Sequence, residues 1–430
     1  MDFSRALQPA LQLLKPIADE FTEAGYRLYL VGGIVRDLAF GLPGDMADLD
    51  LTTDARPAFI SDVLKSHASV LWTQGERFGT IGAQVGGKAV EITTHRSETY
   101  VVDTRKPEVN FGDSLDVDLS RRDFTINAMA ISIPDAEFFD PFGGLSHLKQ
   151  RVLATPIDPT VSFSDDPLRM LRAARFLARF DLAPDPGLGL AAADLASRLD
   201  VVSRERISAE LDRLFEIPEP RSGFTFLLDA GLLQWAIPQM GTCSENDLIV
   251  ATSLASSPGN LDVRRAGLLY RLSKDRIRQA LAQLRYSVDV QRRSKRLLEE
   301  LDLVLTPAAS VQAVRQLVVN LDLSLSSGRP CQQVVDLRQL AENISTLIPS
   351  VEYDGSFFEV LDGALAEGEV LRYRSALSGH EIMELLDAAA GPIVGQAKSK
   401  LRDHWIQTGS HSADDARDLL SSWDRGQSSN

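Results

Sequence analysis

Cysteine is nearly absent from this sequence. Only Cys243 and Cys331 occur among 430 residues, and they form neither a CxxC motif nor a cluster with histidine. The sequence therefore argues against a thiolate zinc site and excludes a disulfide-stapled mini-protein. So few thiols are typical of the reducing cytoplasm, which is the location that we expect.

Long hydrophobic runs are also missing. No stretch approaches the roughly 20 apolar residues that a membrane-spanning helix needs. Residues 1–21 alternate apolar and charged side chains at helical spacing, without the basic start and cleavage site of a signal peptide. We expect a soluble intracellular protein with no membrane partner, and the sequence does not report its oligomeric state.

Positive charge is in the minority. Lysine and arginine number 45 against 60 acidic residues, which gives a formal net charge of −15. This balance argues against indiscriminate nucleic-acid binding, because counterion release favours basic surfaces, but it leaves room for a local basic track. One such stretch, residues 263–296, holds eleven basic residues and two acidic ones. It fits contact with RNA phosphates or a set of solvated helix faces, and the sequence does not separate the two.

The first 135 or so residues have the pattern of a small α/β domain with a mixed sheet. An apolar run at residues 27–31 leads into two glycines and a short helix. Residues 47–53 alternate polar and apolar side chains, and two later strand-like segments flank a glycine pair typical of a hairpin. From about residue 145 to nearly residue 410, leucine, alanine and arginine recur at helical spacing, so the remainder should be mostly helical.

The two glycines after the apolar run are Gly32 and Gly33. A strand running into this pair and then into a helix start exposes backbone N–H groups that suit a phosphate. Arg36 lies in the first turn of the predicted helix and could bind a triphosphate oxygen through two N–H groups. An ordinary turn with a surface arginine is the alternative.

Two aspartates, Asp48 and Asp50, share one face of the predicted strand. Period-2 geometry places their carboxylates about 7 Å apart along the strand. Such a pair repels itself, and a hard divalent cation such as Mg²⁺ would relieve the repulsion while needing few protein ligands. Glu91, on the polar face of another predicted strand, is a candidate third carboxylate. A solvent-facing acidic strand is the alternative interpretation.

An arginine-rich helix is predicted to begin at a proline, in the stretch DDPLRMLRAARFLARF. Its arginines, at spacings of 3, 3 and 4, fall within about one third of the helix circumference. They are Arg169, Arg172, Arg175 and Arg179. Like charges on one face cost stability unless an anion balances them, which favours a polyphosphate or an RNA backbone as counterpart. A solvated basic face is the alternative.

Five motifs occur in a fixed order along the chain: LVGGIVRD, DLDLTT, RRDFTINAMA, DPFGG and DDPLRMLRAARF. This ordered set resembles the class II tRNA nucleotidyltransferases, the CCA-adding enzymes, which share the DNA polymerase beta-like superfamily with bacterial poly(A) polymerases. The resemblance covers roughly residues 26–215. Several motifs in one order are far more specific than any single one.

The resemblance implies a role for each matched position. Asp48 and Asp50 match a metal-binding DxD, with Mg²⁺ as the expected cofactor. Gly33 and Arg36 match phosphate-contacting positions, and Arg122 matches an arginine that contacts the triphosphate. Two metals would then activate the tRNA 3′-hydroxyl and stabilise the departing pyrophosphate.

The same resemblance assigns base recognition to the arginine-rich helix. Asp166 and Arg169 match the pair that hydrogen-bonds the base of CTP or ATP, and Asp165 replaces the family's usual Glu. Directly before Pro167, the Asp166 side chain is also suited to cap the helix, which would make it unavailable to a base. Asp123 equally suits a helix N-cap. The sequence leaves these interpretations open.

The implied fold is α+β, with a polymerase-beta-like nucleotidyltransferase head over residues 1–138 that contains the mixed sheet. Mostly α-helical parts follow: a neck that recognises the base (139–216), a body that binds tRNA (217–345) and a tail (346–430). The last 20 or so residues are polar enough to fray or be disordered. The charged stretch 98–118 resembles the mobile loop that couples C-to-A switching in full CCA-adding enzymes.

The implied function is template-independent addition of C, C and A, from CTP and ATP, to tRNA held by its 3′ end and acceptor arm. A poly(A) polymerase or a partial CC- or A-adding enzyme is the alternative with the same fold. Such poly(A) polymerases usually carry a strongly basic C-terminal extension, whereas this chain ends acidic and polar. A non-catalytic tRNA-binding protein and a dinucleotide-binding domain fit less well, because both aspartates are present and G-x-G-x-x-G is absent.

Overall fold

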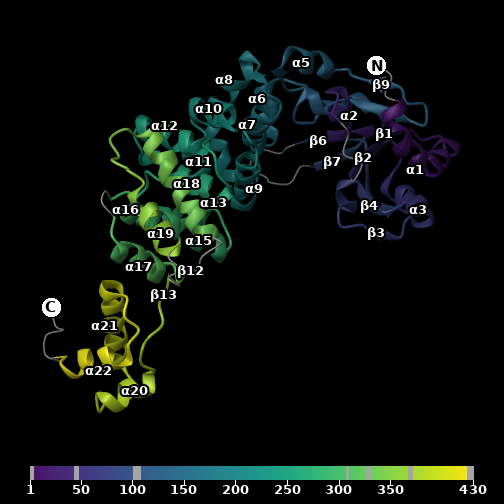
Figure 1. Cartoon of the computed structure of the whole chain (residues 1–430). Coiled ribbons are helices and arrows are strands. Elements are labelled where there is room, and N and C mark those ends of the chain that lie inside the picture. Colours follow the sequence, from purple (N-terminus) through teal and green to yellow (C-terminus); the bar gives the residue numbers. More distant parts are fainter. Residues whose placement is uncertain are drawn as a thin grey trace. The chain divides into compact units, whose positions relative to one another are not determined.

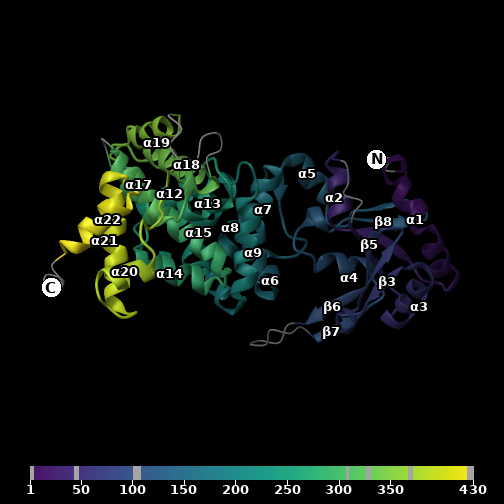
Figure 2. The same cartoon turned by 60° about the horizontal axis from the view of Figure 1, so that its bottom comes forward.

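The computed structural model describes residues 4–42, 48–99, 108–306, 309–325, 331–366 and 371–423. Its contacts divide the chain into two compact units, Met1–Gly241 (unit 1) and Thr242–Asn430 (unit 2), which are described separately (Figure 1 and Figure 2). No helix within these ranges is both long and apolar enough to cross a membrane.

The first part of unit 1 mixes helices and strands. The helices are α1 (Ser4–Glu23), α2 (Gly33–Ala39), α3 (Pro57–His67), α4 (Leu115–Ser120) and α5 (Gly144–Gln150), with 3₁₀ turns η1 (Glu76–Phe78) and η2 (Thr125–Asn127). The strands are β1 (Leu28–Val31), β2 (Asp48–Thr53), β3 (Val70–Trp72), β4 (Thr80–Val85), β5 (Lys88–Thr94), β6 (Arg96–Thr99), β7 (Glu108–Phe111), β8 (Ala130–Ile133), β9 (Phe138–Phe139) and β10 (Val152–Leu153). The helix, strand and hairpin expected in this part are confirmed.

Seven of these strands form one sheet in the order β3-β4-β5-β2-β1-β8-β9. Strand β2 runs parallel to β5, whereas the other neighbouring pairs are antiparallel. The sheet is therefore mixed, as the sequence predicted. Strands β6 and β7 form a separate antiparallel pair.

The two faces of the sheet differ. Helix α3 packs against β4 and β5 and also contacts α1, and on this side Leu49 and Leu51 of β2 are buried. On the opposite side Tyr29 of β1 packs with apolar side chains of α4. Because side chains alternate along a strand, Asp48 and Asp50 project on that second side, where both are exposed. The apolar half of the β2 pattern thus holds the sheet in place, and the polar half is left open.

The rest of unit 1 is mostly helical. Its elements are α6 (Pro159–Asp165), α7 (Leu168–Phe180), β11 (Ala183–Pro184), α8 (Pro186–Asp194), η3 (Ala196–Val201), α9 (Arg204–Phe215), α10 (Arg221–Asp229), α11 (Leu233–Ala236) and η4 (Pro238–Thr242). Helix α7 packs against α9 and α10, with Met170, Ala173 and Phe176 at most 3% exposed. The predicted apolar face of this helix is therefore its core face.

The described residues of unit 2 form helices and one short strand pair. The elements are α12 (Glu245–Ala255), α13 (Leu261–Leu269), α14 (Lys274–Gln283), α15 (Val288–Glu299), α16 (Leu301–Val304), α17 (Val311–Asn320), β12 (Ser324–Leu325), α18 (Gln332–Leu347), α19 (Ser356–Ala366), β13 (Leu371–Arg372), α20 (Gly379–Leu385), α21 (Pro392–Thr408) and α22 (Ala413–Ser421). A large apolar core lies among helices α12 to α19, and a smaller one joins α20, α21 and α22. The mostly helical remainder predicted from the sequence is confirmed.

One expectation needs correction. Disorder of the last 20 or so residues was wrong for α22, because Ser412 accepts a capping hydrogen bond and Ala416 and Leu420 are buried.

The charged stretch 98–118 contains β7 and the start of α4, while residues 100–107 lie outside the described ranges. The contacts divide the chain at Gly241, inside the predicted body, so the four-part division stays a prediction.

Candidate active site

Three carboxylates lie on neighbouring strands at the centre of the sheet. Asp50 of β2 is the register partner of Glu91 on β5, and Asp48 lies two residues before Asp50. Register partners on adjacent strands are about 5 Å apart and point to the same face. The structure therefore brings the predicted pair and the candidate third carboxylate together.

The proximity of these acids changes their protonation. Asp50 keeps an accessible surface, but the protein atoms packed around it reduce its hydration and so raise its pKa. The charge of Arg122 counteracts this shift, and the charge of Asp48 adds to it. The pKa of Glu91 is raised by the same loss of water and by Asp50 and Asp48. Both carboxylates therefore ionise less readily than in water, mainly through desolvation and in part through the neighbouring acids, and a bound cation would favour their ionised forms.

The glycine turn after β1 lies beside the carboxylates. Gly32 has a φ of 75°, which side chains disfavour. A Cβ there would lie 3.6 Å from both Asp50 Oδ2 and Arg122 Nη1, so the backbone passes close to an acid and a base at once. Arg36 of α2 is buried, and it donates 2.8 and 2.7 Å hydrogen bonds to Asp37 Oδ1 and Asn127 Oδ1. Its burial lowers the pKa of Arg36.

Arg122 is held by a carboxylate that the sequence did not single out. Asp118 of α4 is fully buried, and its Oδ1 accepts from Arg121 Nη2 at 2.7 Å while Oδ2 accepts from Arg122 Nη2 at 3.3 Å. Burial alone would raise the pKa of Asp118, but the two guanidinium groups keep it below its usual range. Thr52 of β2 also donates to Asp118 Oδ2, at 3.3 Å, which ties this anchor to the strand of the catalytic candidates.

The arginines of α7 have protein counter-ions. Arg172 donates to Asp123 Oδ2 from Nε at 2.8 Å and from Nη2 at 2.5 Å, and Arg175 Nε donates to Glu210 Oε2 at 2.7 Å. Asp123 is buried, and although burial favours its neutral form, Arg172 and Asn127 hold its pKa below the usual range. The anion expected from the helical spacing is thus supplied in part by the chain itself.

A pair of phenylalanines packs under these cations. Phe176 and Phe180 of α7 stack with ring centroids 5.9 Å apart. The guanidinium carbon of Arg36 lies 4.7 Å from the centroid of Phe180, and that of Arg175 lies 4.5 Å from the centroid of Phe176. Both distances are within the range of cation–π attraction, so the aromatic pair fixes α2 and α7 relative to each other.

The two residues assigned to base recognition make protein contacts here. Asp166 Oδ1 accepts from the backbone N of Leu168 at 3.1 Å, and its Oδ2 accepts from Arg206 at 2.8 Å. Asp166 therefore does cap the start of α7. Arg169 donates to Ser162 Oγ at 2.8 Å and to the Arg121 carbonyl, so both ends of its guanidinium are fixed.

These groups surround one cavity of about 320 Å³, here called the arginine cavity. It is lined by Gly32, Gly33, Arg36, Asp50, Arg121, Arg122, Asp123, Asn127, Asp166, Arg169, Arg172 and Phe176. Eight of the predicted site residues are among them. Arg175 does not line the cavity and instead contacts Glu210 and the ring of Phe176. Asp48 and Glu91 lie beside Asp50 on the sheet.

The donor set fits a hard divalent cation bound in an open site. Among the residues that the structure describes, no three Asp, Glu, His or Cys side chains are grouped so as to hold a metal ion by themselves. Two neighbouring carboxylates are nevertheless enough for Mg²⁺ when substrate phosphates and water complete its octahedron. Asp48 and Asp50 are therefore the residues that would hold it.

Asp118, Asn127 and Glu210 were not found by sequence reasoning. Glu210 had a signal, because it lies at helical spacing from the buried Ile207 and Leu214 on an otherwise apolar face of α9. A lone acid on such a face needs a buried partner, and Arg175 is that partner. Asp118 offered no comparable signal, since its burial depends on the fold of β2 and α4.

Comparisons with known proteins agree on one family. The family model described as "Poly A polymerase head domain" matches residues 28–154, and "Probable RNA and SrmB-binding site of polymerase A" matches residues 182–243. The CCA-adding enzyme of Lactobacillus johnsonii is 32% identical over 324 residues, which cover 73% of this chain and 79% of that protein. The CCA-adding enzyme of Lacticaseibacillus paracasei is 38% identical, but the match spans 54% of this chain and only 57% of that relative's length.

Solved structures share the fold. The structure described as "CCA-adding enzyme apo form II" has a TM-score of 0.68 at 20% identity, with 98% of this chain and 99% of that chain covered. The Bacillus stearothermophilus CCA-adding enzyme in complex with CTP has a TM-score of 0.63 at 23% identity, with 96% of each chain covered. At these identities the likeness establishes the architecture, and the α+β fold expected from the sequence is confirmed.

Proposed function

Because this chain belongs to the family of CCA-adding enzymes, we propose that it adds C, C and A to the 3′ end of tRNA without a nucleic-acid template. CTP and ATP are the proposed nucleotide substrates, and pyrophosphate is the second product. The tRNA is held by its 3′ end and acceptor arm, with the helical body contributing to its binding. We propose the cytoplasm as the location, which suits the free thiols of Cys243 and Cys331.

The observation that carries this proposal is the position of Asp50. This carboxylate lines the arginine cavity together with Arg122, Arg169 and other cations. It is also the register partner of Glu91 on the neighbouring strand β5. A triphosphate in the cavity would meet positive charge on the wall formed by α7 and the turn after α4. Its α-phosphate would face the carboxylates. Phosphoryl transfer depends mainly on such positioning and charge neutralisation, because no covalent intermediate is required.

The predicted residues that line the arginine cavity each have a proposed part in binding, whereas Arg175, paired with Glu210, has none. Gly32, Gly33 and Arg36 form the wall for phosphate oxygens, and Arg122, held by Asp118, contacts the triphosphate. Asp166 and Arg169 read the base edge, which requires them to exchange their present contacts with Leu168 and Ser162 for the base. Arg172 keeps Asp123 charged and in place at the cavity wall.

Metal dependence is general among CCA-adding nucleotidyltransferases, and we propose Mg²⁺ as the ion here. Asp48 and Asp50 would hold it, with Glu91 close enough to support them. When bound, a pair of such ions supplies charge neutralisation at the attacking and leaving oxygens. Asp48, Asp50 and Glu91 themselves orient the site and supply the negative charge that attracts a cation.

A nucleotide incorporation assay tests the proposal. Full-length protein with Mg²⁺ is given a tRNA that lacks its 3′ CCA, with CTP alone, ATP alone or both. We expect two added residues with CTP alone and three with both. Long A tails with ATP alone would instead indicate a poly(A) polymerase, and arrest after two C residues with both nucleotides a CC-adding enzyme. No extension by wild-type protein would contradict the proposal.

A further inference from the structure

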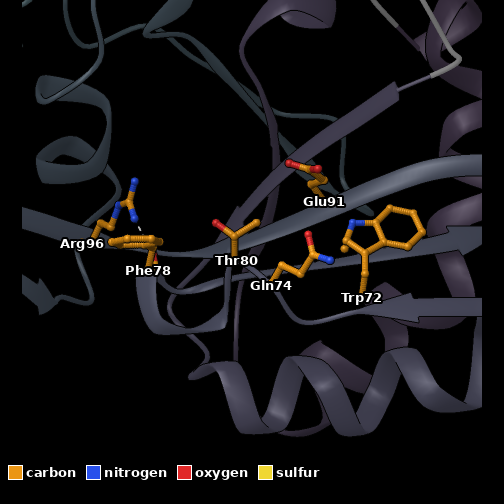
Figure 3. A pocket seen from close by; sticks show the side chains of 8 residues that line it. Trp72, Gln74, Phe78, Thr80, Glu91 and Arg96 are labelled. Carbon is orange, nitrogen blue, oxygen red and sulfur yellow. Dashed lines mark hydrogen bonds between the residues drawn. The ribbon is translucent and has the colours of Figure 1, made fainter. Parts of the chain in front are cut away.

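A second cavity, of about 490 Å³, lies on the sheet next to Glu91. We call it the tryptophan cavity, and it is lined by Trp72, Gln74, Gly75, Phe78, Thr80, Gly82, Glu91 and Arg96. Figure 3 shows Trp72 at one end and Phe78 with Arg96 at the other, with Thr80 and Gln74 between them. Its volume is that of a cavity for a small organic ligand.

The strand register connects this cavity to the carboxylates. Trp72 of β3 pairs with Gly82 of β4, Gly82 pairs with Glu91 of β5, and Glu91 pairs with Asp50 of β2. Register partners project to the same face, so the indole, the glycine and the two acids form one row across four strands. At about 4.8 Å per strand, the Trp72 backbone lies roughly 10 Å from that of Glu91.

Gly82 makes room for the indole. A Cβ at this position would lie 1.8 Å from Trp72 Nε1 and 2.4 Å from its Cε2, which is too close for any other residue. The ring therefore lies directly over the strand backbone, half-buried, with part of its surface toward the cavity. The half-buried indole therefore presents a flat aromatic surface in the same row as the two acids.

The two cavities lie on either side of the acid pair. Asp50 lines the arginine cavity and Glu91 lines the tryptophan cavity, and these two residues are register partners. In-line transfer to a phosphorus atom places the attacking and leaving oxygens on opposite sides of it. If the leaving pyrophosphate occupies the arginine cavity, the attacking hydroxyl arrives from the side of Glu91.

We propose that the tryptophan cavity binds the 3′-terminal nucleotide of the RNA that is extended, with its base stacked on Trp72. This inference rests on the proposed function and adds the position of the second substrate. The 3′-hydroxyl of that nucleotide then points along the row toward Glu91 and Asp50. Its oxygen attacks the α-phosphorus, its proton leaves to solvent or to a carboxylate, and the bond to pyrophosphate breaks.

The chemistry of the cavity suits this occupant. Stacking on an aromatic side chain tolerates every base, because each has a π-face, so the same site accepts an end whose last base changes as the RNA is extended. Arg96 donates from Nη1 to the Phe78 carbonyl, which keeps its positive charge at the far end of the cavity, where the RNA backbone phosphate would enter. Gln74 and Thr80 supply polar groups between the two ends.

A cycle that combines a protein variant with a modified RNA tests the stacking. The RNAs are one tRNA ending in CC and the same tRNA whose terminal C is replaced by an abasic ribonucleotide. With wild-type protein and ATP, we expect the abasic end to raise the KM for tRNA about tenfold. Trp72→Ala should raise it about tenfold on the intact tRNA and cause no further loss on the abasic one, because both changes remove the same contact. The KM for ATP should stay within about twofold.

Two variants control for folding. Trp72→Phe keeps an aromatic surface and should retain most of the affinity for tRNA. Trp72→Leu keeps apolar contact with Gly82 but has no aromatic surface, so its affinity for tRNA should fall as in Trp72→Ala. Val70→Ala changes an exposed residue of the same strand outside the cavity and should leave the KM for tRNA unchanged. An equal loss for Trp72→Ala on both RNAs, or a loss seen only in the KM for ATP, would overturn the proposal.

Binding measurements separate this proposal from the proposed function. The same cycle, measured as equilibrium binding of the two tRNAs to an Asp50→Asn variant, requires no turnover. A roughly tenfold preference for the intact end that disappears in the Trp72→Ala, Asp50→Asn double variant supports the cavity even if wild-type protein adds no nucleotide. Equal binding of both RNAs to the Asp50→Asn protein overturns the cavity assignment, even where wild-type protein extends tRNA normally.

Discussion

Two arginine-rich segments of this chain use the same residue type in different ways. In α7 of unit 1, Arg172 pairs with Asp123 and Arg175 with Glu210, and both acids are buried. These partners lie 49 and 35 positions away along the chain. The arginines of α7 therefore depend on tertiary structure for their positions, and one wall of the arginine cavity depends on them.

In unit 2, the stretch 263–296 pairs mostly within its own helices. Arg292 contacts Asp289 at 2.6 Å and Arg278 contacts Asp275, both at a spacing of three residues and both exposed. Of the eleven basic side chains in this stretch, only those of Arg264 and Arg265 are buried. By their content of basic residues the two segments look alike. They differ in how far along the chain each counter-ion lies from its arginine, and in how deeply that counter-ion is buried. Buried, distant counter-ions mark a prearranged site, whereas local exposed ones mark a solvated helix face.

The test with the largest expected effect removes the carboxylate of Asp50, which lines the arginine cavity opposite α7. We expect Asp50→Asn to reduce turnover by at least about 10³-fold, because the ligand for a cation and its charge at the transferred phosphate are both lost. tRNA affinity should remain within a few-fold. Single-turnover incorporation and filter binding measure the two quantities, and a parallel fall in both would mean that Asp50 serves RNA binding or folding instead.

The second test compares the stability contributed by one arginine. Arg172→Ala leaves the buried Asp123 without its main counter-ion, which should lower the free energy of unfolding by about 3 kcal/mol. Urea unfolding followed by circular dichroism measures this change. Arg172→Ala combined with Asp123→Ala is the control and should recover part of the loss, since no charge is then buried alone. A loss below about 0.5 kcal/mol would place Arg172 with the solvated arginines of unit 2.

The third test concerns specificity. Arg169→Ala removes the guanidinium proposed to read the base, while the Ser162 hydroxyl and the Arg121 carbonyl are left to water. We expect the ratio of kcat/KM for CTP to that for ATP to change by about tenfold, the size of one lost charge-assisted hydrogen bond. Competition between the two nucleotides on a tRNA ending in C measures this ratio. An unchanged ratio would remove Arg169 from base recognition.

The fourth test is a pH series. The pKa of Asp123 is lower in the folded protein than the usual 3.8, so its ionised form contributes stability above that value and loses it as the pH falls through the folded-state pKa. We expect Asp123→Asn to be less stable than wild type at pH 7 by about 1–2 kcal/mol, and this difference to shrink from about pH 4 downward. Asp289→Asn, at an exposed pair, is the control and should differ little from wild type at any pH. A gap of constant size for Asp123→Asn would contradict the buried ion pair.

The sequence predicted the elements of the fold and which residues meet at the site, but not how they are held. Alternation in β2 was enough to place Asp48 and Asp50 on one face, because a strand's side-chain direction is a local property. The row from Trp72 to Asp50 could not be predicted, because strand order and register depend on which distant strands pair. Helix α22 was not predicted because its sequence is mostly polar. It forms with a cap at Ser412 and with Ala416 and Leu420 buried.

The arginines of α7 illustrate the same limit. Their helical spacing was readable from the sequence, and it led us to expect a polyphosphate or an RNA backbone as the anion that balances them. It could not indicate that Asp123 and Glu210 supply part of that anion, because these acids reach α7 only through the packing of α7 on α9 and on the turn after α4. The positions of the arginines that line the cavity are therefore set by the fold, and the triphosphate that we propose there would add negative charge beside Asp123, which already pairs with Arg172.

The smallest expected effect comes from unit 2. In Arg292→Ala the partner Asp289 stays in water, and an exposed pair at a spacing of three residues contributes a few tenths of a kcal/mol. We expect the free energy of unfolding to change by less than about 0.5 kcal/mol, measured by the same urea titration as Arg172→Ala. Arg265→Ala is the matched comparison within this stretch, because its guanidinium is buried, and it should cost more than Arg292→Ala. If Arg292→Ala proves as costly as Arg172→Ala, exposure and sequence distance do not separate the two arginine segments, and their difference has to lie in the ligands that they bind.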